Sequence, residues 1–221
     1  MKDRERPQVG ALFRLLAGND VRYVVTGSVA VLLHGVRLDP GDLDITPALD
    51  RDNLARLART LQAIEARPDP DGPFGEWLEE SAGEWRWVER QPAAGEVEAR
   101  RAWRADPGDP ASFDELLRSR LGALDVVPRV SGTYDELAPR AVQIEAFGAR
   151  LLVESIADLL ATLTVPRREK DRDRVAALRA LQRVDAGGAR AVVPGGARPE
   201  PVIASAAMER ANGRGSRPEG G

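Results

Sequence analysis

The chain of 221 residues contains no cysteine and only one histidine, His34. These absences exclude disulfide bridges, thiolate zinc sites, a cysteine nucleophile and a metal site built from several histidines. No apolar run is long enough to cross a bilayer, so we expect no membrane partner. Because residues 1–13 lack the apolar core of a signal peptide, we expect a cytoplasmic protein.

Positive charge is not in excess either. The 32 Lys and Arg residues are outnumbered by 35 Asp and Glu residues, and the formal net charge is −3. A protein that binds nucleic acid through a broadly basic surface would have the opposite balance, so any such contact must be local. Only Lys2 and Lys170 are lysines, a pattern typical of a source biased toward arginine codons rather than of selected arginine sites.

The apolar residues predict alternating helices and strands in the first part of the chain. They recur at helical spacing over residues 9–16 and 51–66. Residues 23–25 and 42–46 have instead the β-branched or alternating pattern of strands. A short helix from Ser28 to His34 is expected between these two strands, with Ser28 as its cap.

The later part of the chain predicts further strands and a short helix. Residues 84–88 and 123–127 have strand patterns, and residues 142–153 resemble a hairpin. Residues 112–117 begin like a short helix, because a serine and a glutamate stand in capping-box register.

We expect an α/β core over residues 1–154 and a C-terminal helical segment over 155–185 that packs on it. Helices are predicted over about 155–163 and 168–184. The remainder, 186–221, is rich in Gly, Pro, Ala and Arg and has little apolar periodicity. We therefore expect a disordered tail there.

Three carboxylates are candidates for a metal site. Alternation within residues 42–46 places Asp42 and Asp44 on one strand face, and Asp125 is the only charge in its predicted strand. If these strands are neighbours in one sheet, the three carboxylates converge. Clustered carboxylates suit a hard cation such as Mg²⁺ or Mn²⁺. Such a site favours phosphoryl or nucleotidyl transfer.

Gly27 and Ser28 predict a second part of the site. They stand between a strand and a helix, where backbone N–H groups and a hydroxyl can bind phosphate oxygens. Plain helix capping is a simpler explanation of a Gly-Ser step, and Asp-x-Asp also occurs in surface turns. Neither pattern is specific alone, but the combination favours an NTP bound beside a metal ion.

Basic residues gather at the start of the last predicted helix, namely Arg167, Arg168, Lys170, Arg172 and Arg174. They could form a face toward a polyanion. The interleaved acidic residues are at least as typical of an ordinary solvated helix.

The order of these residues resembles that of a known superfamily. Thr26-Gly27-Ser28, a helix and then Asp42-Leu43-Asp44 resemble the pattern of the DNA polymerase β-like nucleotidyltransferases, and Leu124–Val127 stands where they have a third carboxylate. Ile156–Leu160 and Arg168–Arg172 resemble the C-terminal helices of small bacterial nucleotidyltransferase-like proteins, including AbiEii-type toxins of toxin–antitoxin systems.

The resemblance implies an α+β fold with a mixed sheet flanked by helices. It also implies that Asp42, Asp44 and Asp125 hold Mg²⁺ or Mn²⁺, and that Gly27 and Ser28 contact the triphosphate of an NTP. Asp125 would in addition help to deprotonate the acceptor hydroxyl.

The expected function is transfer of an NMP from an NTP to a hydroxyl of RNA, such as tRNA, or of a protein, in a toxin–antitoxin setting where the antitoxin is a partner. Relatives carry a Ser-Lys pair where this chain has Thr162-Leu163, and Lys170 could partly substitute for that lysine at the nucleotide. The difference favours the alternative of a nucleotide-binding or protein-interaction module with weak or no catalysis. A third hypothesis, modification of a small molecule, ranks lower because no second substrate-binding domain is recognisable.

Overall fold

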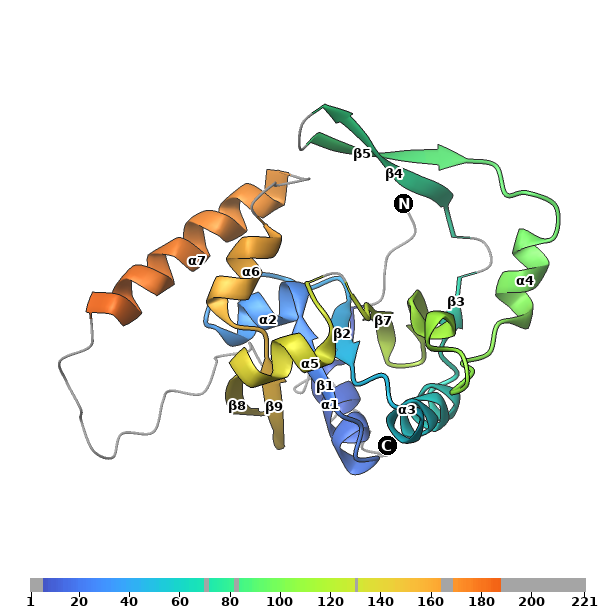
Figure 1. Cartoon of the computed structure of the whole chain (residues 1–221), viewed down its shortest axis with the longest axis horizontal. Helices are drawn as coiled ribbons and strands as arrows, with labels where there is room; N and C mark the ends of the chain where they lie inside the picture. The colour runs from blue at the N-terminus through green and yellow to red at the C-terminus, as the bar shows by residue number, and fades with distance from the viewer. Residues whose placement is uncertain (1–5, 70–71, 82–83, 130, 164–168, 188–221) are drawn as a thin grey trace, which may run out of the picture. The chain divides into compact units, whose positions relative to one another are not determined.

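The computed structural model describes residues 6–69, 72–81, 84–129, 131–163 and 169–187 (Figure 1). All of them belong to one compact unit, Met1–Ala189. Helices pack on a mixed sheet in this unit, so the predicted α+β class is confirmed.

Seven strands form the sheet in the spatial order β3, β6, β7, β2, β1, β9, β8. β1 runs parallel to β9 and β2 parallel to β7, whereas the other neighbouring pairs are antiparallel. The bounds are β1 Tyr23–Thr26, β2 Leu43–Pro47, β3 Arg67–Pro68, β6 Glu115–Ser119, β7 Gly122–Val126, β8 Val142–Ala146 and β9 Ala149–Val153. This order places β7, β2, β1 and β9 next to one another in the middle of the sheet.

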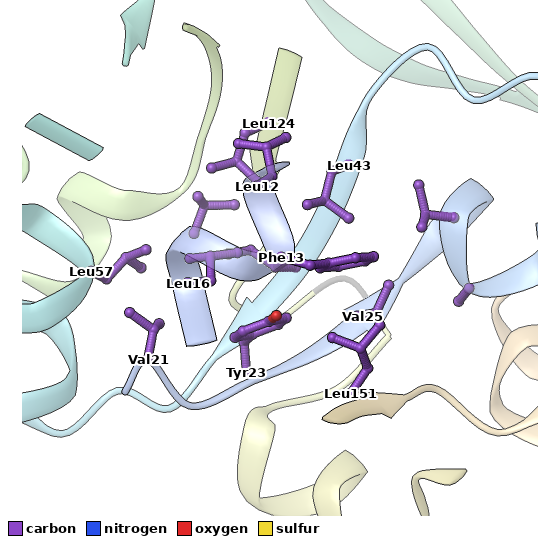
Figure 2. Close-up of a cluster of buried hydrophobic side chains, with 14 of the residues drawn as sticks. Leu12, Phe13, Leu16, Val21, Tyr23, Val25, Leu43, Leu57, Leu124 and Leu151 are labelled. Atoms are coloured by element: carbon purple, nitrogen blue, oxygen red, sulfur yellow. The ribbon is translucent and has the colours of Figure 1, made fainter. Parts of the chain in front are cut away.

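The apolar core lies between the sheet and two amphipathic helices, α1 (Val9–Gly18) and α3 (Arg51–Ala63). Figure 2 shows Phe13 of α1 beside Tyr23 of β1, and their rings stack with centroids 6.5 Å apart. Leu57 of α3 lies in the same cluster. Burial of these side chains is the main stabilising contribution to the fold.

Four further helices pack on the sheet or on one another. α2 (Gly27–Leu33) contacts β1 and β2, and α5 (Tyr134–Leu137), which runs on into the 3-10 turn η2 (Ala138–Arg140), contacts β1. α6 (Ile156–Thr162) contacts α2, and α7 (Glu169–Gly187) contacts α6.

The C-terminal helices share the core of the unit. The Ser155 hydroxyl caps α6 by accepting a hydrogen bond from the Asp158 N–H at 3.1 Å. Leu159 of α6 and Leu178 of α7 are buried in the core cluster. The disordered tail expected from residue 186 begins too early, because α7 continues to Gly187. Residues 188–221 lie outside the described part. In the part of the chain that is described, no helix is long and apolar enough to cross a membrane.

A separate two-stranded sheet consists of β4 (Phe74–Ser81) and β5 (Glu84–Arg90). The strand predicted over residues 84–88 is therefore confirmed. α4 (Glu96–Ala102) follows this hairpin, and the guanidinium of Arg100 lies over the Phe74 ring, 3.6 Å from its centroid.

The helix predicted over residues 112–117 is wrong. Pro110–Phe113 forms a 3-10 turn, η1, and β6 begins two residues later. Leu117 is fully buried in β6, whereas the neighbouring Leu116 is 42% exposed, which is the alternation of a strand. Because β6 pairs with β7 along its whole length, long-range pairing outweighs the local capping signal.

Candidate active site

The carboxylates of β2 and β7 stand side by side on the sheet. Asp44 and Asp125 are register partners on these parallel strands, so both side chains belong to the same face. Leu43 and Ile45 are fully buried in the core, and the alternation of the strand therefore turns Asp44 away from it. Asp42 directly precedes β2. The two strands are thus neighbours, as convergence of the predicted carboxylates requires.

The turn between β1 and α2 lies against Asp44. Thr26 is the register partner of Asp44 on β1. The predicted Ser28 cap is wrong, because α2 begins at Gly27 with Thr26 as its N-cap and Ser28 lies within the helix. Gly27 has a φ of +61°, and a Cβ at this position would lie 2.2 Å from Oδ2 of Asp44. The position therefore requires glycine. The backbone N–H of Ser28 donates to the same carboxylate oxygen at 3.4 Å.

Asp44 is held in an environment that opposes its negative charge. Burial, together with the charges of Asp42 and Asp125, raises the pKa of Asp44 to about 8. The Ser28 N–H and the positive charge of Arg174 act in the opposite direction. In the absence of a cation, this aspartate is therefore largely protonated at neutral pH.

Asp125 shows the same trend to a smaller extent. Burial, followed by the charges of Asp42, Asp114 and Glu115, raises the pKa of Asp125 to about 6. It therefore remains mostly ionised at neutral pH. Acidic residues at or beside β2, β7 and the start of β6 thus raise the pKa of Asp44 and of Asp125 through their negative charges.

The donor chemistry of this end of the sheet fits a hard divalent cation. Asp42, Asp44 and Asp125 provide only carboxylate oxygens, and a cation would relieve the repulsion among them. Among the residues that the structure describes, no group of three or more His, Cys, Asp or Glu side chains forms a ready metal cage. An open set of carboxylates is nevertheless usual for Mg²⁺, which keeps several waters and binds substrate phosphates.

A fourth acidic residue, Glu154, follows β9 and was not predicted as part of the site. Its backbone N–H donates to the carbonyl oxygen of Val25 at 2.9 Å. The residue is 1% exposed, and neither carboxylate oxygen makes a well-formed hydrogen bond to a described residue. Burial raises its pKa to about 7, and weaker contacts from Ser131, the Gly27 N–H and Thr162 act in the opposite direction. Glu154 is a charge at the end of an otherwise apolar strand pattern, as Asp125 is, and this sequence signal could have indicated it.

Arg174 of α7 was predicted only as one of a group of basic residues, and not as a residue that acts on the site. Arg174 pairs with Asp171, with Nη1 and Oδ1 3.5 Å apart, and its charge lowers the pKa of Asp44. Arg172 is exposed, as expected for a solvated helix. Lys170 belongs to α7, but its side chain lies outside the described part, so its contact with a nucleotide stays a prediction.

No protein-family model and no curated protein matches this chain. What the described residues define is a class of site: neighbouring carboxylates on a mixed sheet, beside a strand-to-helix turn that requires glycine. The particular activity is therefore argued from this geometry and from the resemblance of the motifs.

Proposed function

We propose that the protein is a nucleotidyltransferase that uses Mg²⁺ or Mn²⁺ and transfers an NMP from an NTP to a hydroxyl. The observation that supports this most is the registered pair of Asp44 and Asp125 beside the Gly27 turn. Like charges held together in a partly buried position cost folding stability, so a functional role is the better explanation. The resemblance of Thr26–Ser28 and Asp42–Asp44 to the DNA polymerase β-like superfamily indicates the same chemistry.

Each site residue has a defined role in the proposed reaction. Asp42, Asp44 and Asp125 would hold the metal ion, which when bound stabilises negative charge on the phosphate oxygens. Gly27 and Ser28 would contact the triphosphate. The Ser28 hydroxyl is buried and has no hydrogen-bond partner among the described residues.

Asp125 would accept the proton of the acceptor hydroxyl as a general base. The acceptor oxygen forms a bond to the α-phosphorus of the NTP. The bond between that phosphorus and the oxygen bridging to the β-phosphorus breaks, and pyrophosphate leaves with the electron pair.

Calorimetric titration of ATP, GTP, CTP and UTP in the presence of Mg²⁺ tests the nucleotide site. We expect at least one NTP to bind the wild-type protein, and the Asp42→Asn/Asp44→Asn double variant to bind it more than about tenfold more weakly, because each lost charge removes a strong contact. Asp52→Asn, an exposed aspartate on α3, is the matched control. Equal affinities for the wild type and the double variant would contradict the proposal.

The acceptor is tested with the NTP that binds, labelled on its α-phosphate. We propose RNA, such as tRNA, or a protein as the acceptor, in a toxin–antitoxin setting with an antitoxin partner. Nuclease sensitivity of the transferred label indicates RNA, and protease sensitivity indicates protein. Asp44→Ala should abolish transfer while its cooperative unfolding is retained. Label transfer at the wild-type rate by this variant would reject the mechanism.

The alternative of a binding module keeps one observation in its favour. The described carboxylates do not form a ready metal cage, and a module that only binds a partner would not need one. This alternative predicts that an NTP or a protein partner binds without label transfer to any hydroxyl acceptor, and that Asp44→Ala leaves the interaction unchanged.

A further inference from the structure

The seven-stranded sheet has two edges, and they differ in how they are protected. β3 forms one edge with only two residues, Arg67–Pro68, and proline has no N–H to donate. α4 also contacts β3. β8 forms the other edge, and in the described part of the chain no strand pairs with its outer side. Its five residues contain neither proline nor lysine and pair with β9 in unbroken register. A regular edge of this kind can accept another strand.

The turn between β8 and β9 shows which backbone groups of β8 face outward. Both turn residues have positive φ, which is the geometry of a two-residue type I′ hairpin turn. The pair that closes the turn, Ala146 and Ala149, is therefore hydrogen-bonded. Hydrogen-bonded and non-hydrogen-bonded pairs alternate along antiparallel strands, so Gln143 and Glu145 turn their N–H and C=O groups away from β9.

The pairing of β9 with β1 leads to the same assignment. The Glu154 N–H donates to the carbonyl oxygen of Val25 on β1 at 2.9 Å. Even-numbered residues of β9 therefore direct their backbone groups toward β1, and odd-numbered residues direct theirs toward β8. Gln143 and Glu145 are register partners of two even-numbered residues. Their backbone groups thus lie along the outer edge of the sheet.

The side chains of β8 are complementary to those of a second, antiparallel copy of the same strand. With a two-fold axis at Ile144, this residue meets its own copy, and Val142 meets Ala146 of the other copy. Gln143 then stands opposite Glu145, so no like charges are paired. Val142 is 40% exposed, and Ile144 is packed at the margin of the core. Such pairing would extend the apolar face of the sheet across both copies.

We propose that the protein forms a two-fold symmetric dimer in which the β8 strands of two copies pair in antiparallel register about Ile144. Gln143 and Glu145 form two hydrogen-bonded pairs in this register, and each such pair exchanges two N–H···O bonds. An axis at Glu145 would instead place two glutamates opposite each other, which is unfavourable. The dimer does not depend on the proposed activity.

An introduced thiol tests the register, because the chain contains no cysteine. Ile144→Cys places the two thiols of a dimer in a non-hydrogen-bonded pair, whose Cα separation of about 4.5 Å allows a disulfide. Val142→Cys is the matched control, since its two thiols would be on the order of 14 Å apart along the strands. With oxidised glutathione as the oxidant, we expect the Ile144 variant to form covalent dimers on a non-reducing gel and the control to remain largely uncrosslinked.

Substitutions at the exposed Gln143 test the side-chain pairing. Gln143→Lys places a positive charge opposite Glu145 of the other copy, and sedimentation equilibrium should show a dimer about threefold or more tighter. Gln143→Glu places like charges there and should weaken the dimer by a similar factor. Arg150 lies 3.6 Å from Glu145 within one copy, which keeps both effects moderate. Gln62→Glu, the same change at an exposed position of α3, should leave association unchanged.

Opposite effects of the two Gln143 substitutions distinguish strand pairing from misfolding, because a damaged fold would not tighten the dimer. We expect wild-type dimers at about 100 μM. A wild type that stays monomeric there overturns the inference and leaves the β8 edge to a strand of a different protein. Equal crosslinking of the Ile144 and Val142 variants, or a dimer weakened by Gln143→Lys, would also overturn it.

Discussion

Gly27 is the residue at which backbone geometry and the candidate site are most directly linked. Its positive φ is unfavourable for residues with a Cβ, and a Cβ would lie 2.2 Å from the Asp44 carboxylate. We expect Gly27→Ala to lower the free energy of unfolding by about 1–3 kcal/mol and to weaken metal-dependent NTP binding, because Asp44 must move. Urea unfolding and calorimetry measure the two effects.

Gly35→Ala separates the two contributions at Gly27. Gly35 also has a positive φ, of +100°, but among the described residues nothing lies within 4 Å of a Cβ built there. This variant should lose stability through backbone strain and keep nucleotide affinity. If Gly27→Ala behaves like Gly35→Ala in both measurements, the close approach to Asp44 has no functional consequence.

Glu154 predicts a pH dependence of folding stability. Its pKa is about 7 in the folded protein and near the ordinary value of about 4.3 in the unfolded chain. The folded state therefore binds more protons between these values, and stability falls as the pH rises through that window. Glu154→Gln cannot ionise, so its stability relative to the wild type should increase from pH 4 to pH 8 by on the order of 1–3 kcal/mol.

Urea unfolding of both proteins across this pH range checks the prediction. The amide of Gln has its own burial cost, but that cost does not change with pH, so the slope is diagnostic. Glu145→Gln, an exposed glutamate on β8, is the control and should show a flat difference. A flat difference for Glu154→Gln would mean that the buried carboxylate does not hold a proton.

At the scale of elements, the N-terminus of α3 shows how a local interaction stabilises a helix that supports the sheet. Asp50 is the N-cap, and its carboxylate accepts a hydrogen bond from the Asn53 N–H at 3.1 Å. It also forms an exposed ion pair with Arg22. We expect Asp50→Ala to cost about 1 kcal/mol of folding free energy through the lost cap.

Asp50→Asn is the matched variant for this helix, because it keeps the capping oxygen and loses the charge. Its cost should be less than that of Asp50→Ala, since exposed ion pairs contribute only about 0–1 kcal/mol. Thermal unfolding at two salt concentrations distinguishes the contributions. Equal losses in both variants would show that the ion pair, rather than the cap, stabilises this end of α3.

The elements differ in how well their sequence predicted them. α3 follows a regular apolar stripe with an acidic start, and both of its ends are close to the prediction. β6 was missed because its capping-box pattern is local, whereas its pairing with β7 is formed between residues that the sequence does not mark as partners. The start of α2 also depends on a residue far along the chain, because the close approach of Asp44 requires glycine at the first helical position. A local sequence pattern does not show that contact.

At the scale of the whole molecule, the carboxylate site predicts that metal binding stabilises the fold. Burial and like charges raise the pKa of Asp44 to about 8, so the ionised site is unfavourable at that pH without a cation. A ligand that binds only the folded state at about ten times its Kd adds about 1.4 kcal/mol. We expect MgCl2 at pH 8 to raise the Tm of the wild type and not that of Asp44→Asn.

KCl at the same ionic strength is the control for general salt effects. Asp44→Asn should also be the more stable protein when no Mg²⁺ is present, because the charge that costs stability is gone. An equal rise in Tm for the wild type and the variant would contradict metal binding at this site.

The sequence by itself determined the helices with regular apolar stripes, the strands around Val24 and Ile45, and the presence of Asp44 and Asp125 as charges in apolar surroundings. Those features depend on the periods of the helix and the strand, which act over a few residues. Only the tertiary structure decided the register that places Asp44 beside Asp125, the strand at β6, and the positions of Glu154 and Arg174. Strand pairing and helix packing join residues far apart in the chain, and no local pattern specifies which of them meet.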